Sequence, residues 1–256
     1  MVSRRVPADL AAALGSLAAG ATVTVLVHRP GTRSLVQQVD DGWYDLIQRT
    51  NSPPREAASR ILDVAFGTTL DWTIRAAVTV QLLHSRRWAA LAAWATTVAL
   101  GEVSVGPLKS AVDRPRPDAP MTRTSMASYP SGHALAAATT APGLVLALLP
   151  PGPARRRLLA VAVPLAGVTA LSRTVLNAHW LSDVVGGFAL GTGYALAAPR
   201  LVAALRPRAP AADRRSNHVA DNHGRRRGRV DGYSTVRPSS RPRVTASARE
   251  ETPSLR

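Results

Sequence analysis

The sequence contains no cysteine and only one lysine. Without cysteine the protein cannot form disulfides, thiolate metal sites or a cysteine nucleophile, so its chemistry must use oxygen and nitrogen groups. Thirty-one arginines stand against the single lysine, Lys109. Because arginine fills nearly every other basic position, this bias suggests that position 109 requires a compact, flexible ammonium group and not a planar guanidinium.

The formal net charge of +16 is distributed unevenly. Residues 206–256 carry thirteen arginines and five acidic residues, and this difference accounts for half of the net positive charge of the chain. We therefore expect no specific nucleic-acid partner for the rest of the chain. The same segment is rich in Arg, Pro, Ser and Gly and has almost no large apolar groups, so it is predicted to be a disordered tail. Its run Arg225–Arg229 is more typical of contact with anionic headgroups than of nucleic-acid binding.

Apolar residues occur in long blocks, although the mean hydropathy of the whole chain is 0.00. A helix needs about 20 mostly apolar residues to cross the hydrocarbon core of a bilayer. Six segments come close to that length and predict an all-α fold, a six-transmembrane helix bundle in a domain of residues 1–205. On the last segment, Gly187 and Gly191 predict close packing inside the bundle. The six segments are about 10–27, 61–83, 88–108, 133–150, 158–176 and 183–204.

Two of these segments leave alternatives open. The second contains Asp63, Asp71 and Arg75, and charges inside a membrane are costly unless paired. Asp71 and Arg75 stand at helical i,i+4 spacing and could pair, so we expect a span with an interfacial start; the alternative is a short span after Asp71. Glu102 of the third segment could pair with Arg75 or form a simple interior hydrogen bond. The first segment follows two arginines and resembles a signal peptide, but its length favours an uncleaved span.

Arginine clusters predict how the chain is oriented in the membrane. Clusters at Arg4-Arg5, Arg86-Arg87 and Arg155–Arg157 precede spans one, three and five. Positive charge in short loops marks the cytoplasmic side, so these clusters and the tail are predicted to be cytoplasmic. The segments of about 28–60, 109–132 and 172–182 then face outward. The sequence therefore predicts a multi-pass cell-membrane protein.

The outward segment 28–60 is expected to form an interfacial helix that breaks at Pro53-Pro54. Trp43 and Tyr44 are typical of the headgroup level of a membrane. For this segment we expect a packing role and not a catalytic one.

The other two outward segments contain a set of basic side chains that fits a phosphate. Phosphoryl transfer spreads negative charge over three equatorial oxygens, so it is catalysed mainly by well-placed positive groups. Lys109, Arg116 and Arg173 supply three. Arg114 is a fourth candidate, but the doubled Arg-Pro of DRPRP leaves one arginine with a structural role, and its prolines predict an extended path.

The sequence Pro130-Ser131-Gly132-His133 lies where the fourth span begins. The free amides of a helix N-terminus attract phosphate, Ser131 could add its hydroxyl, and Gly132 permits close approach of the backbone. His133 could then act as a general acid. The alternative is a turn that simply caps a helix.

His179 and Asp183 are four residues apart, which places them on one face if the sixth span begins nearby. The carboxylate could then accept a hydrogen bond from one ring nitrogen and leave the other free as a nucleophile or base.

Taken together, these residues resemble the type 2 phosphatidic acid phosphatase superfamily. Its signature is K-x6-RP, PSGH and SR-x5-H-x3-D, and the chain matches all three parts between residues 109 and 183. The resemblance covers about residues 60–205. It implies that His179 attacks phosphorus, that Asp183 orients it and that His133 protonates the leaving oxygen. It also implies that no metal or cofactor is needed and that the phosphate is held by Lys109, Arg116, Ser131, Gly132 and Arg173.

The predicted function is therefore hydrolysis of a lipid phosphate or pyrophosphate at the outer membrane face through a phosphohistidine. Candidate substrates are phosphatidic acid, phosphatidylglycerol phosphate, diacylglycerol pyrophosphate and undecaprenyl pyrophosphate. A soluble acid phosphatase or vanadate-dependent haloperoxidase of the same superfamily is disfavoured by the spans. The alternative from another class is a non-catalytic membrane protein that binds or transports a lipid phosphate. The sequence leaves the lipid and the oligomeric state open.

Overall fold

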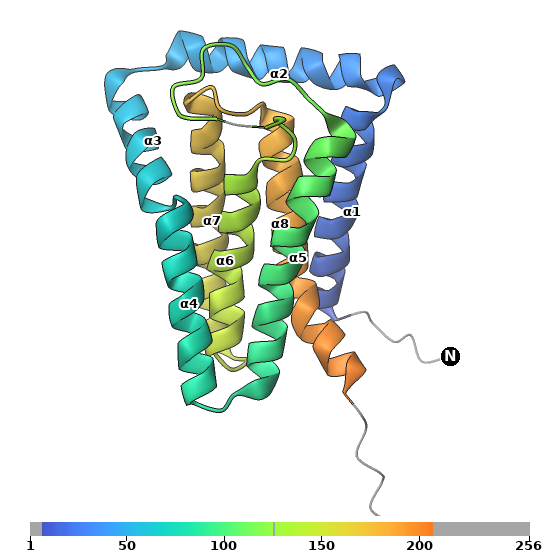
Figure 1. The fold of residues 1–256 in the computed structure, drawn as a ribbon, viewed down its shortest axis with the longest axis vertical. Coiled ribbons are helices and arrows are strands. Elements are labelled where there is room, and N and C mark those ends of the chain that lie inside the picture. The colour runs from blue at the N-terminus through green and yellow to red at the C-terminus, as the bar shows by residue number, and fades with distance from the viewer. Residues whose placement is uncertain (1–6, 125, 207–256) are drawn as a thin grey trace, which may run out of the picture. The chain divides into compact units, whose positions relative to one another are not determined.

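The computed structural model describes residues 7–124 and 126–206, and the regular secondary structure of this part of the chain is all α-helix. The predicted disordered tail therefore lies almost wholly outside the described residues. Eight α-helices and no strand are found within the described ranges (Figure 1). The helices are α1 (Ala8–His28), α2 (Pro30–Thr50), α3 (Pro53–Ala65), α4 (Thr68–His84), α5 (Trp88–Val112), α6 (Gly132–Leu148), α7 (Pro153–Val175) and α8 (Leu181–Leu205).

Six of these helices form the bundle. α8 packs against α1, α5, α6 and α7, and α6 also contacts α4, α5 and α7. Helix α2 runs across one end of the bundle, roughly perpendicular to the other helices (Figure 1). The 113–131 segment and the turn between α7 and α8 lie at that same end, whereas the turns that carry Arg86-Arg87 and precede Arg155–Arg157 lie at the opposite end.

Four of the described helices are long and apolar enough to cross a membrane, namely α1, α5, α7 and α8. Helix α6 is apolar but has only 17 residues, and α4 also has 17. A helix of that length extends about 25 Å, less than the roughly 30 Å of a bilayer core. All six predicted segments thus contain a helix, and the protein is a multi-pass membrane protein, but a count of six spans stays a prediction.

The second predicted segment does not form one helix. It is broken at Phe66-Gly67, so Asp63 belongs to α3 and α4 begins only at Thr68. A Cβ atom on Gly67 would lie 2.7 Å from the carbonyl oxygen of Asp63, which explains why glycine is needed at this break. The expected start of the span near residue 61 is therefore wrong. The prediction of a break after the 28–50 region is confirmed, because α2 ends at Thr50 and α3 starts at Pro53.

The charges within α4 are paired inside the bundle. Arg75 Nε lies 2.8 Å from Asp71 Oδ2, as the i,i+4 spacing predicts, and Arg75 Nη1 donates to Glu102 of α5 at 2.5 Å. Arg75 also donates to Thr140 of α6 at 3.0 Å. Since an unpaired charge would be costly at this depth, the network accounts for charged residues on an otherwise apolar helix.

Two glycines allow α8 to approach α6 closely. A Cβ atom on Gly187 would lie 2.7 Å from the carbonyl oxygen of Ser131, and one on Gly191 would lie 2.5 Å from that of Leu135. The predicted small-residue face of this helix therefore packs within the bundle. The contact sets the position of the α6 N-terminus against the start of α8, where the candidate site lies.

Candidate functional site

His179 lies in the turn between α7 and α8, and Asp183 lies in the first turn of α8. The carboxylate of Asp183 accepts the backbone N–H of Trp180, the residue that caps α8, at 2.9 Å. His179 therefore precedes the helix, and the expectation that both residues share one helical face is wrong. The capping turn brings them together instead, with His179 Nδ1 at 3.7 Å from Asp183 Oδ2.

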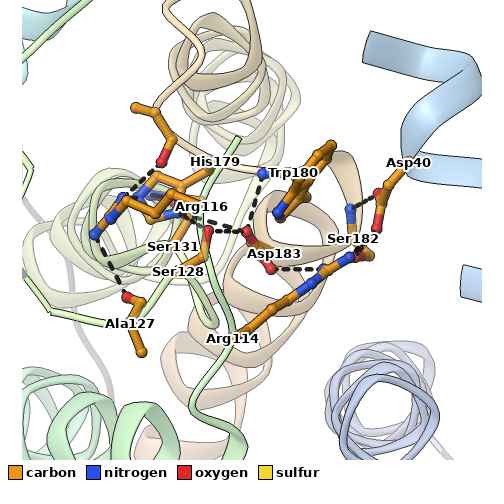
Figure 2. Close-up of polar contacts among 12 residues, drawn as sticks. Asp40, Arg114, Arg116, Ala127, Ser128, Ser131, His179, Trp180, Ser182 and Asp183 are labelled. Carbon is orange, nitrogen blue, oxygen red and sulfur yellow. Dashed lines mark hydrogen bonds and ion pairs between the residues drawn. The ribbon is translucent and has the colours of Figure 1, made fainter. Parts of the chain in front are cut away.

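Ser128 lies between the two side chains. Its hydroxyl donates to Asp183 Oδ2 at 2.5 Å, and its Oγ is 3.5 Å from His179 Nδ1 (Figure 2). On the other side of the ring, Arg116 Nη1 donates to His179 Nε2 at 3.2 Å. Because a guanidinium can only donate, Nε2 presents its lone pair toward the cations and the ring proton lies on Nδ1, toward Ser128 and Asp183.

The environment of His179 keeps its ring neutral. Burial lowers the pKa of His179 to about 4; Asp183 acts in the opposite direction, while Arg116 and Lys109 lower the pKa further. A neutral imidazole with an unprotonated Nε2 is the form that can act as a nucleophile or base at neutral pH.

Arg116 and Lys109 meet at a single backbone carbonyl. Lys109 Nζ and Arg116 Nη2 both donate to the oxygen of Ala127. Arg116 also donates to the oxygen of Ala178 at 2.5 Å, next to His179. The DRPRP segment follows α5 and forms neither helix nor strand, and the chain turns at Asp113 with a φ of 40°.

Arg116 keeps its charge in this setting. Burial lowers the pKa of its guanidinium, Asp183 acts in the opposite direction, and Arg173 lowers it further. A guanidinium nonetheless stays protonated in proteins. Arg116 is thus a fixed positive charge within the electrostatic influence of Arg173, the third predicted cation.

Arg173 and His133 come together at Asp63 of α3. Arg173 Nη1 forms an ion pair with Asp63 Oδ1, and His133 Nε2 lies 3.4 Å from the same oxygen. The other oxygen, Oδ2, accepts a hydrogen bond from Thr122 at 3.0 Å. A carboxylate oxygen therefore occupies the position between a predicted phosphate-binding arginine and the predicted general acid.

Ser131 and Gly132 lie at the start of α6, as predicted. Ser131 is the N-cap residue, and its hydroxyl accepts the N–H of Ala134 at 3.4 Å. A Cβ atom on Gly132 would meet nothing within 4 Å, so there is open space beside this backbone. A cavity of about 220 Å³ between α4, α5 and α6 reaches Gly132 and His133. Ser131 thus caps the helix, and the open space beside Gly132 would allow a phosphate to approach the helix N-terminus.

Arg114 is the structural arginine of the DRPRP segment. It is buried and forms ion pairs with Asp40 of α2 at 2.6 Å and with Asp183 at 2.9 Å. It is therefore held by carboxylates and does not join the phosphate set.

Three residues of this region were not identified from the sequence, namely Asp40, Asp63 and Ser128. The sequence predicts Asp63 within a membrane span and Asp40 within a segment that packs against the bundle. Only Ser128 carried a local signal, since it lies two residues before the Pro130–His133 motif. No group of three or more His, Asp or Glu side chains that could hold a metal ion is found among the described residues.

The chain is similar to known proteins in sequence and in fold. A family model described as the PAP2 superfamily matches residues 88–207. Phosphatidylglycerophosphatase B from Bacillus subtilis is 38% identical over 89 residues, which are 33% of this chain and 44% of that protein. The match thus spans less than half of the curated relative.

The fold is also similar to a solved structure. The crystal structure of a transmembrane PAP2 type phosphatidylglycerolphosphate phosphatase from Bacillus subtilis superimposes with a TM-score of 0.60 and 22% identity. The similarity covers 77% of this chain and 97% of the solved chain, so the two share the bundle architecture. The family match and the three motifs together show that residues 88–207 are similar to the PAP2 superfamily.

Proposed function

We propose that this protein is an integral-membrane lipid phosphatase that hydrolyses a phosphomonoester or pyrophosphate of a phospholipid or polyprenyl lipid. The observation that carries the proposal is the orientation of His179. Its Nε2 lone pair faces Arg116, while its Nδ1 side faces Asp183 and Ser128. This is the arrangement needed for a histidine to attack phosphorus beside positive charges.

In the first step His179 Nε2 attacks phosphorus and the bond to the leaving oxygen breaks, giving a phosphohistidine. His133 donates a proton to the leaving alcohol or phosphate. In the second step water attacks the phosphohistidine, His133 accepts a proton from that water, and phosphate leaves with His179 restored. Lys109, Arg116 and Arg173, with Ser131 and the Gly132 N–H, hold the phosphoryl oxygens through both steps.

A lipid substrate fits the surroundings of the site. An apolar cavity of about 240 Å³ lies between α4, α6 and α7, beside Phe66 at the end of α3. An acyl or prenyl chain can remain in such an apolar space while its headgroup reaches the polar end of the bundle. Because the curated relative is named a phosphatidylglycerophosphatase, phosphatidylglycerol phosphate is the first candidate, followed by phosphatidic acid and undecaprenyl pyrophosphate.

We further infer that α4 and α6 also cross the membrane and that the site faces outward. The turn at Arg86-Arg87 lies at the end of the bundle opposite the site. The turn that precedes Arg155–Arg157 lies at the same end. Positive charge in short loops favours the cytoplasmic side, which supports an extracytoplasmic site and a cytoplasmic C-terminal segment.

The test is phosphate release by the purified protein in detergent, with a chelator present. The lipid panel is phosphatidylglycerol phosphate, phosphatidic acid, diacylglycerol pyrophosphate and undecaprenyl pyrophosphate. His179→Ala is assayed in parallel and is expected to be inactive yet folded, with a phosphohistidine trapped only in the wild type. No release from any lipid by folded wild-type protein would contradict the proposal. It would favour a protein that binds or transports a lipid phosphate without hydrolysing it.

A further inference from the structure

Arg114 connects helix α2 to the carboxylate of Asp183. Its Nη2 donates to Asp40 Oδ2 at 2.6 Å, and its Nη1 donates to Asp183 Oδ1 at 2.9 Å (Figure 2). The side chains of all three residues are at most 1% exposed. Asp40 lies 74 positions before Arg114 in the chain, so this contact depends on how α2 crosses the end of the bundle.

Ser182 closes a ring between Asp40 and Arg114. Its backbone N–H donates to Asp40 Oδ1 at 2.8 Å and its hydroxyl donates to Asp40 Oδ2 at 2.6 Å. Arg114 Nη1 lies 2.6 Å from the same hydroxyl oxygen. Both oxygens of Asp40 are therefore used, and a buried ion pair held by several hydrogen bonds has little freedom to move.

This ring determines which oxygen of Asp183 faces His179. Arg114 holds Oδ1, while Oδ2 accepts the Ser128 hydroxyl and the Trp180 N–H and lies 3.7 Å from His179 Nδ1. If Arg114 moved, the carboxylate could rotate and the ring of His179 would lose its fixed orientation.

The charges of the three side chains also depend on one another. Arg114 is one positive charge shared between two buried carboxylates. Without Asp40, the guanidinium would act on Asp183 alone and weaken that carboxylate as an acceptor for His179. Without Arg114, both carboxylates would be left as buried charges.

We propose that Asp40 and Arg114 are positioning residues that hold the orienting carboxylate Asp183, so that α2 is part of the catalytic apparatus. This inference rests on the proposed function and goes beyond it. It also revises the expectation that the 28–60 segment only packs against the bundle.

The test is the isosteric substitution Asp40→Asn, assayed with dioctanoyl phosphatidic acid in detergent. We expect kcat to fall at least about tenfold. This loss should be smaller than the loss that follows removal of the orienting carboxylate itself. KM and the inhibition constant for orthovanadate, a phosphate analogue, should stay within about twofold, because the residues proposed to bind phosphate are intact. Arg114→Lys should give the same pattern, since one ammonium cannot bridge both carboxylates.

The matched control is Asp45→Asn. Asp45 lies on the same helix and pairs with Arg49 at the surface, where the two side chains are 63% and 80% exposed. This variant should keep wild-type kcat. If Asp40→Asn does not fold, Ser182→Ala replaces it, because Ser182 bonds to both members of the pair; a smaller loss of kcat at constant KM is then expected.

Asp40→Asn with wild-type kcat in folded protein would overturn the inference, as would a rise in KM with kcat unchanged. The double variant Asp40→Asn/Asp183→Asn should have the same kcat as Asp183→Asn alone. The effects of two residues are not additive when one acts through the other. Additive losses would also overturn it. Wild-type protein without turnover on any lipid would instead overturn the proposed function, and this inference with it.

Discussion

At the scale of single residues, the site is defined by how each polar group is paired. His179 is neutral and buried, with cations beside one ring nitrogen and Ser128 and Asp183 beside the other. Lys109 and Arg116 share a backbone carbonyl, whereas Arg173 is paired with a carboxylate. These differences predict different responses to substitution and to pH.

The pKa of His179 predicts how activity depends on acid. Burial lowers this pKa from an ordinary value near 6.5 to about 4, so the nucleophile stays unprotonated as pH falls through 6.5 and becomes charged only near 4. We therefore expect the acidic limb of kcat/KM to lie near pH 4. The measurement is kcat/KM between pH 3.5 and 7, with recovery of activity at pH 7 as the control for unfolding. A limb at pH 6.5 would contradict this assignment.

Lys109→Arg tests whether position 109 needs an ammonium group. Lys109 is only 7% exposed and its Nζ donates to the Ala127 oxygen, which leaves little room for a planar guanidinium. Although the charge is preserved, kcat/KM should fall by about tenfold or more. Arg49→Lys, at an exposed position on α2, is the control and should be neutral. Equal activity of Lys109→Arg and wild type would show that the single lysine has no special role.

Asp63→Asn tests whether a carboxylate competes with the phosphate. Asp63 forms an ion pair with Arg173 and contacts His133, so a phosphoryl group must displace it from both. Loss of its charge should lower KM and the inhibition constant for orthovanadate by about three- to tenfold. A tenfold change corresponds to about 1.4 kcal/mol of binding free energy. Glu56→Gln on the same helix serves as the control. Weaker binding in Asp63→Asn would mean that Asp63 supports the site instead of competing with its ligand.

At the scale of helices and turns, local sequence patterns predict where helices form, whereas pairings between residues far apart in the chain cannot be predicted from them. The apolar blocks predicted a helix in each of six segments, and the sequence from Pro130 to His133 predicted the start of α6. The break at Gly67 is not predicted, because a continuous apolar pattern does not show that a glycine shortly after Asp63 interrupts the helix. Asp63 and Arg173 are 110 positions apart, and nothing in either local sequence indicates that they pair.

The contact between α6 and α8 gives a prediction at this scale. In Gly191→Ala the new methyl group would lie 2.5 Å from the Leu135 oxygen and 2.9 Å from Ala138 Cβ. Such overpacking should destabilise the fold by about 1–3 kcal/mol, measured as a lower thermal unfolding temperature in detergent. Gly15→Ala is the control, because nothing lies within 4 Å of a Cβ atom there. An unchanged unfolding temperature for Gly191→Ala would show that the two helices can separate at little cost.

At the scale of the whole molecule, the absence of cysteine makes the orientation in the membrane directly measurable. A cysteine at Gly42 on α2 should react with a membrane-impermeant maleimide in intact cells. A cysteine at Ala154, beside the arginines of α7, should react only after permeabilisation. The cysteine-free wild type supplies the background. The reverse labelling pattern would place the site on the cytoplasmic side.

The unequal lengths of the bundle helices also affect the surrounding lipid. α5 and α8 have 25 residues each, whereas α4 and α6 have 17. If all of them cross the membrane, no single bilayer thickness matches every helix. The hydrocarbon layer must then become thinner beside α4, the helix that borders the apolar cavity, and hydrophobic mismatch of this kind costs only fractions of a kcal/mol per Å. Lipid next to this cavity would thus already be compressed before any substrate binds.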